Sequence, residues 1–218
     1  MNDANLEASN ETLISNLCQL DNRLRELFAT KIRHYALYNH TLAVLNEFNK
    51  YFANWILKDI LSRDKMRLFL ALHDIGKPFA YQDGNKSKQH QYTLQILNDI
   101  KVNLGVNDGE FNLFTALSAN DPLGKYFQSA ISSLLTSDLI ISIAKDNHIV
   151  IQDYLEILTV YFQVDAGSYT KDAGGLPYLE KLFVYNNGNK VLHECGTRLI
   201  FNSELEKKYN ELKKQLGL

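Results

Sequence analysis

Sparse turn residues constrain this chain more than any other feature of its sequence. The 218 residues include eleven glycines and three prolines, and apolar residues recur mostly at spacings of three and four. That spacing places apolar side chains on one face of an α-helix, and few turn residues interrupt it. We therefore predict a mainly helical protein, with helices at about residues 11–30, 33–58, 63–75, 88–103, 109–118, 122–145 and 150–167.

The pattern changes beyond residues 174–175. Two short apolar runs, 182–185 and 190–192, flank Asn186–Asn189, whose residues tolerate positive φ, so we predict a small β-hairpin. Leu199–Phe201 is a third extended piece. Ser203 and Glu206 have the spacing of a capping box, which predicts that Ser203 opens a final helix. The apolar stripe of that helix comprises Leu205, Tyr209, Leu212 and Leu216. We expect it to pack on its own domain, and the alternative is a homodimer contact.

Size and composition suit one globular domain spanning residues 1–218. The 45% hydrophobic and 22% charged residues match globular averages and exclude a disordered or fibrous chain. A net charge of -2 supplies no overall positive field that would bind nucleic acid along the protein surface. A local basic pocket for one phosphate is still compatible with this charge.

Two features of the sequence bear on the compartment. Cys18 and Cys195 are the two cysteines, so one chain builds neither a disulfide scaffold nor a thiolate zinc site. The first twenty residues are rich in acids and amides, and no apolar run reaches the roughly 18 residues of a membrane helix. We expect a soluble, cytoplasmic protein without a membrane partner.

The segment Leu70–Pro78 contains the chemically most suggestive residues. A helix with an apolar inner face arrives at adjacent His73 and Asp74 and is followed by Gly76 and Pro78, which we expect to stop it. Neighbouring residues point about 100° apart on a regular helix, so both could bind one ion only with the looser geometry of a helix end, which Gly76 can provide. By itself the pair could equally be a capping Asp and a packed His.

Three further polar residues fall on apolar stripes, where an unpaired charge is costly. They are His40, His90 and Asp165. Each alone could be a structural residue bonded to nearby backbone. Together, His40, His73, Asp74 and Asp165 offer two imidazoles and two carboxylates, which suit one divalent ion. We predict manganese, iron, cobalt, nickel, zinc or magnesium.

The order His40, then His73–Asp74, then Asp165 resembles the HD-domain superfamily of metal-dependent phosphohydrolases over about residues 30–170. The run His73–Pro78, followed by a glycine-containing loop and His90, is similar to the HD domains associated with bacterial tRNA nucleotidyltransferases, and Thr41–Val44 fits too. The resemblance implies an HD-type helical bundle at about 30–170, with the hairpin and final helix appended at 176–218.

The resemblance also bears on the number of metal ions. Dinuclear members carry further histidines in the middle of the domain, whereas this sequence has only His148 between His90 and Asp165. A single-metal site is therefore favoured. No nucleotidyltransferase domain precedes the HD region, so the resemblance implies the hydrolase module alone.

The predicted reaction is hydrolysis of a phosphate ester of a nucleotide or an RNA end by a metal-activated water. The resemblance implies a phosphomonoester or a phosphodiester as the substrate, with a 2′,3′-cyclic phosphate as one candidate. The predicted catalytic residues are Asp74, Lys77 and His90. Lys77 would meet a phosphate oxygen, and His90 would donate a proton to the phosphate or the leaving oxygen, so both are predicted substrate contacts. For Lys77 the alternative is a lysine that offsets a helix C-terminal dipole.

Two other functions stay open. The same fold could serve as a non-catalytic module that binds a nucleotide or a partner protein, although all four ligand positions are filled in this sequence. A metal–water site of this composition could also support oxygen-dependent or lyase chemistry, but the single-metal count argues against the diiron version.

The remaining candidates receive structural interpretations. Asp121 stands where dinuclear relatives carry additional ligands, but it also directly precedes Pro122, and we favour a helix cap. His34 lies six residues before His40, about 240° away around the same predicted helix, which places it at the surface. His193, in the predicted hairpin, is assigned a structural role.

Overall fold

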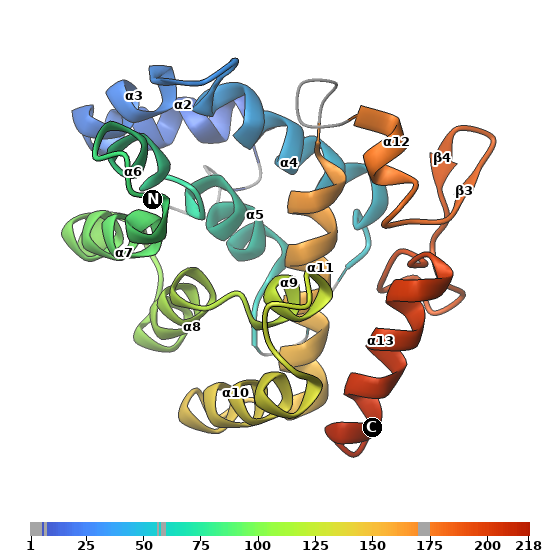
Figure 1. The fold of residues 1–218 in the computed structure, drawn as a ribbon. Coiled ribbons are helices and arrows are strands. Elements are labelled where there is room, and N and C mark those ends of the chain that lie inside the picture. Colours follow the sequence, from blue (N-terminus) through green and yellow to red (C-terminus); the bar gives the residue numbers. More distant parts are fainter. Residues whose placement is uncertain (1–5, 7, 56, 58–59, 170–174) are drawn as a thin grey trace. The chain divides into compact units, whose positions relative to one another are not determined.

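The computed structural model describes residues 6, 8–55, 57, 60–169 and 175–218. The fold is mainly helical with two small two-stranded sheets, which confirms the predicted fold class (Figure 1). The chain divides into two compact units, Met1–Phe48 with Ile56–Asn120 and Asn49–Trp55 with Asp121–Leu218. Among the described residues, no helix combines the length and apolar character needed to cross a bilayer.

The first unit begins with two helices where the sequence predicted one at 11–30. Helix α2 (Asn10–Leu20) ends before Asp21, and α3 (Asn22–Ala29) begins after it. Asp21 has an extended backbone (φ -150°, ψ 123°), and its side chain accepts a hydrogen bond from the Arg23 amide at 2.8 Å. This cap starts a new helix, so apolar spacing alone could not reveal the break.

A hairpin replaces the first turn of the predicted helix 33–58. Strands β1 (Lys31–Ile32) and β2 (Tyr35–Ala36) pair around Arg33, whose φ is 56°. Helix α4 (Leu37–Tyr51) follows, and the Leu37 amide donates to the Thr30 carbonyl at 3.1 Å. Residues 56 and 58 of the predicted last turn lie outside the described part of the chain.

Helix α5 (Arg63–Leu72) is the buried helix of the first unit. Every residue from Lys65 to Leu72 is buried. The buried Arg67 guanidinium donates to the Leu6 and Ala8 carbonyls, both at 2.6 Å, so this charge is compensated by backbone. The helices that follow are α6 (Lys77–Gln82), η1 (Lys86–Lys88), α7 (Gln89–Ile100), η2 (Lys101–Asn103) and α8 (Asp108–Ala119).

Helix α5 stops just before this segment, as predicted, but Gly76 and Pro78 lie at the start of a new helix, α6. Pro78 lies in the first turn of α6, where its missing amide needs no partner. Gly76 has ordinary helical angles (φ -80°, ψ -13°). Its role is spatial: a β-carbon at position 76 would lie 2.3 Å from the Gln89 carbonyl oxygen and 2.4 Å from the Thr93 amide nitrogen of α7. The backbones of this turn and of α7 are therefore in direct contact.

The second unit contains α9 (Pro122–Phe127), α10 (Ser133–Asp146), α11 (Ile151–Gly167) and α12 (Gly175–Leu179). The predicted helix 122–145 is broken at Ser129, whose φ is 59°, and Ser132 caps α10 by accepting from the Leu135 amide at 3.2 Å. Helix α10 packs against α9, α11 and α13 (Ser203–Gln215).

The C-terminal hairpin is shorter than predicted. Strands β3 (Tyr185–Asn186) and β4 (Asn189–Lys190) flank Asn187 and Gly188, which both have positive φ. The predicted third piece, Leu199–Phe201, lies beside the hairpin through the bridges Phe183↔Phe201 and Leu192↔Leu199.

The final helix is capped by a residue other than the predicted one. The side chain of Asn202, not of Ser203, accepts from the Leu205 amide at 2.9 Å. Glu206 instead pairs with Arg198 at 2.6 Å. The apolar stripe is buried within the chain, so a second copy would have to use another face of this helix; the stripe comprises Leu205, Tyr209, Leu212 and Leu216.

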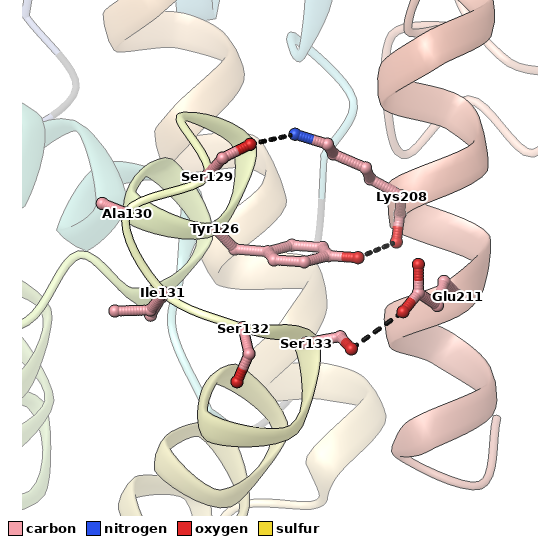
Figure 2. Close-up of a pocket in the computed structure, with 8 residues that line it drawn as sticks. All are labelled: Tyr126, Ser129, Ala130, Ile131, Ser132, Ser133, Lys208 and Glu211. Carbon is pink, nitrogen blue, oxygen red and sulfur yellow. Dashed lines mark hydrogen bonds between the residues drawn. The ribbon is translucent and has the colours of Figure 1, made fainter.

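A hollow in the second unit lies between the loop joining α9 to α10 and helix α13 (Figure 2). Its polar lining is engaged internally: the Tyr126 hydroxyl donates to the Lys208 carbonyl at 3.2 Å, and Lys208 Nζ donates to Ser129 Oγ at 2.8 Å. Ser133 Oγ donates to Glu211 Oε1 at 2.8 Å. These bonds tie α13 to α9, to α10 and to the loop between them, and none of the predicted site residues lines the hollow.

Candidate metal centre

The site is built where α5 ends. His73 has helical angles (φ -57°, ψ -28°), and the chain then turns so that the Lys77 amide donates to the Asp74 carbonyl at 2.9 Å. Both candidate side chains are buried, with 3% of His73 and 4% of Asp74 exposed. A buried helix therefore delivers an imidazole and a carboxylate, side by side, to the interior of the first unit.

The ring of His73 is held in one orientation by its own helix. His73 Nδ1 lies 2.7 Å from the Leu70 carbonyl oxygen. Because a carbonyl can only accept, Nδ1 is the donor, and in the neutral ring Nε2 carries the lone pair. His73 Nε2 lies 3.4 Å from Asp74 Oδ2. An imidazole whose other nitrogen is fixed by a carbonyl is the usual arrangement for a metal ligand.

His40 reaches the same carboxylate oxygen from α4. His40 Nε2 lies 2.9 Å from Asp74 Oδ2, and 9% of its side chain is exposed. The His40 ring also neighbours the Tyr35 and His73 rings, with centroids 5.7 and 5.8 Å away. The hairpin before α4 thus contributes Tyr35 to one side of the imidazole, and His73 covers another.

Lys77 is also directed at Asp74. Lys77 Nζ donates to Asp74 Oδ2, and 25% of the lysine side chain is exposed. It lies at the first residue of α6, so the alternative interpretation, a lysine at a helix C-terminus, was wrong. Burial acts to raise the pKa of Asp74, but its interactions with His73, then Lys77 and then His40 hold that pKa well below the usual range. The carboxylate is therefore ionised at neutral pH.

Sequence reasoning missed Gln89. Its Nε2 donates to Asp74 Oδ1 at 2.7 Å. A glutamine beside the predicted His90 at the start of a helix carries no signal of this role in the sequence. The contact depends on the close approach of Gly76 to α7, which is a tertiary feature.

The remaining predicted residues belong to other elements of the fold. His90 is half-buried, next to Gln89 on α7. Asp165 belongs to the second unit, near the C-terminal end of α11, and its role as a ligand stays a prediction.

Asp121 caps α9 by accepting from the Gly124 amide at 2.9 Å, as the cap interpretation predicts. His34 is exposed, but in the turn of the hairpin rather than on a helix. His193 Nδ1 lies 3.2 Å from Cys195 Sγ.

The arrangement in the first unit can hold a divalent cation. Ligand atoms of His40, His73 and Asp74 lie within 4.8 Å of one another. Two imidazoles and an ionised carboxylate suit ions of intermediate hardness. The Asp74 charge offsets that of the cation, and the low exposure of the three side chains excludes most competing water.

In comparisons with known proteins, no family model, curated protein or solved structure matches this sequence.

Proposed function

We propose that this chain is a metal-dependent phosphohydrolase of the HD type, which cleaves a phosphate ester of a nucleotide or of an RNA end. One observation carries the proposal: His40 Nε2 and His73 Nε2 both lie within 3.4 Å of the buried Asp74 Oδ2. The His73 tautomer fixed by the Leu70 carbonyl directs a nitrogen lone pair toward that carboxylate. A lone pair beside a carboxylate is stabilised by a cation between them.

The ligand set follows from this geometry and from the sequence order. His40, His73 and Asp74 would hold the ion. Asp165 is assigned as the fourth ligand on the sequence pattern alone, where it ends an apolar helical stripe. The negative charges of two carboxylates cancel the charge of a divalent ion, and neutral imidazoles add none. This cancellation lowers the free-energy cost of burying the ion.

The bound ion would lower the pKa of a water molecule and withdraw charge from a phosphoryl oxygen. The chain's own residues bind and orient the substrate. Lys77 brings a positive charge to the site, and its flexible stem lets the ammonium group turn from Asp74 to a phosphate oxygen. His90 follows Gln89, which touches Asp74, and we assign it proton donation to the leaving oxygen.

The test combines metal analysis of the purified protein with a substrate panel. The panel contains nucleoside monophosphates, deoxynucleotides, cyclic nucleotides and an RNA with a terminal 2′,3′-cyclic phosphate. We expect one equivalent of a divalent metal and turnover that a chelator removes and added metal restores. Asp74→Asn should lose metal and turnover together. The matched control is Asp83→Asn, because Asp83 is exposed and pairs with Lys88 at 3.1 Å.

Two outcomes would count against the proposal. Undiminished turnover in Asp74→Asn at full metal occupancy would remove the assigned site. Nucleotide binding without turnover of any panel member would favour the non-catalytic binding module.

A further inference from the structure

The two oxygens of Asp74 have different partners. Oδ2 faces the imidazole nitrogens of His40 and His73, together with Lys77 Nζ. Oδ1 accepts a hydrogen bond from Gln89 Nε2 at 2.7 Å. An ionised carboxylate oxygen can only accept, so the end of the glutamine side chain that faces it is the NH₂ group. One oxygen thus contacts an amide, and the other contacts the two candidate imidazole ligands and the Lys77 ammonium group.

The position of Gln89 is set by the backbone. It is the first residue of α7, and its carbonyl oxygen would lie 2.3 Å from a β-carbon at position 76. The Gly76 amide also donates to Thr93 Oγ1, one turn along α7, at 3.1 Å. Since Gly76 is two residues from Asp74, this contact fixes the start of α7 relative to the carboxylate. The backbone contact therefore places the glutamine within reach of Asp74.

We infer that Gln89 is a positioning residue of the metal centre, which makes Asp74 bind the ion through Oδ2 alone. The inference rests on the proposed function. A carboxylate can bind a metal with one oxygen or with both. The Gln89 hydrogen bond occupies one lone-pair position of Oδ1 and orients the carboxylate, which disfavours binding through both oxygens, and a neutral amide adds no charge that opposes the cation. Partners that orient a ligand in this way typically contribute a factor of about 10–100 to metal affinity.

The experiment titrates Co²⁺ into the metal-free full-length chain, with calorimetry for affinity and visible absorption for coordination. Gln89→Met keeps the side-chain length but removes the donor, and we expect the Kd for Co²⁺ to rise about 10–100-fold. The cobalt spectrum should change as well, since Asp74 gains freedom to bind with both oxygens. A purely structural residue would leave that spectrum unchanged at full occupancy.

Two further variants complete the test. Gln91→Met makes the same substitution at an exposed position of the same helix, and should retain the wild-type affinity and spectrum. Gln89→Asn keeps an amide on a shorter side chain that no longer reaches Asp74, so its Kd for Co²⁺ should also rise. This variant keeps the test decisive even if Gln89→Met folds poorly. Thermal melts of each metal-free variant establish that it is folded.

The outcomes separate this inference from the proposed function. If the wild-type chain binds no Co²⁺, the metal centre is wrong and the role of Gln89 falls with it. If the wild-type chain binds Co²⁺ and folded Gln89→Met or Gln89→Asn does so with unchanged affinity and spectrum, the metal centre stands and the role of Gln89 is overturned.

Discussion

Gly76→Ala tests the contact on which the geometry of the site depends. The added β-carbon would lie 2.3 Å from the Gln89 carbonyl oxygen and 2.4 Å from the Thr93 amide nitrogen. Ordinary contact begins near 3.4 Å, so 3.4 minus 2.3 gives a required retreat of about 1.1 Å. The two nearest atoms are backbone, so a rotation of the Thr93 side chain, whose Oγ1 would lie 2.6 Å away, cannot relieve the overlap.

The cost has two parts. Overpacking of this size typically costs about 1–3 kcal/mol. The retreat also weakens the buried hydrogen bond from the Gly76 amide to Thr93 Oγ1, which adds about 1 kcal/mol. We expect the free energy of unfolding to fall by about 2–4 kcal/mol, which lowers the melting midpoint by roughly 4–16 °C for a chain of this size.

Urea and thermal unfolding of the metal-free protein measure this effect. The matched control is Gly109→Ala in α8, where the nearest atom to a new β-carbon is the Asn107 side chain at 3.3 Å. That variant should be unchanged or more stable by up to about 1 kcal/mol, because alanine favours helices over glycine. If Gly76→Ala unfolds at the wild-type midpoint, the described contact between the turn and α7 is wrong. The same retreat would take Gln89 beyond hydrogen-bonding distance of Asp74, so Gly76→Ala should also weaken Co²⁺ binding.

Three further predictions concern other residues. Tyr154 is fully buried, and its hydroxyl has no hydrogen-bond partner within the described part of the chain, so Tyr154→Phe should leave the free energy of unfolding at pH 7 unchanged or raise it by about 1 kcal/mol. Tyr209→Phe is the contrasting variant, because it loses a contact at 3.2 Å to Thr159, and it should cost about 1 kcal/mol. Urea unfolding measures both effects. Burial raises the pKa of Tyr154, so the contribution of this tyrosine to stability is complete below pH 10 and is lost as the pH rises further. Unfolding midpoints measured above pH 10 should therefore fall less steeply with pH in Tyr154→Phe than in the wild type. Equal slopes would contradict this prediction. His90→Ala should retain its metal while turnover falls by about 10²–10⁴, and metal content measured beside the kinetics would reveal a ligand role if the ion is lost.

The sequence by itself determined where most helices lie, because apolar periodicity is a local property. Helices α8 and α11 begin and end within two residues of the predicted positions. The breaks at Asp21 and Ser129 escaped prediction, since a side-chain cap or one residue of positive φ interrupts a helix without disturbing its apolar spacing. Likewise, Asn202 and Ser203 are both good caps, and the sequence could not choose between them.

The chemistry divides in the same way. Residue type and order indicated His40, His73 and Asp74 as candidates, because buried histidines and carboxylates need partners wherever they occur. Only the tertiary structure decided that both imidazoles meet Oδ2 of Asp74, that Lys77 joins them, and that an unremarked glutamine holds Oδ1. It also gave Gly76 its reason: its backbone angles suit any residue, but α7 passes too close for a β-carbon. Proximity between segments distant in sequence depends on packing, which periodicity along one segment does not encode.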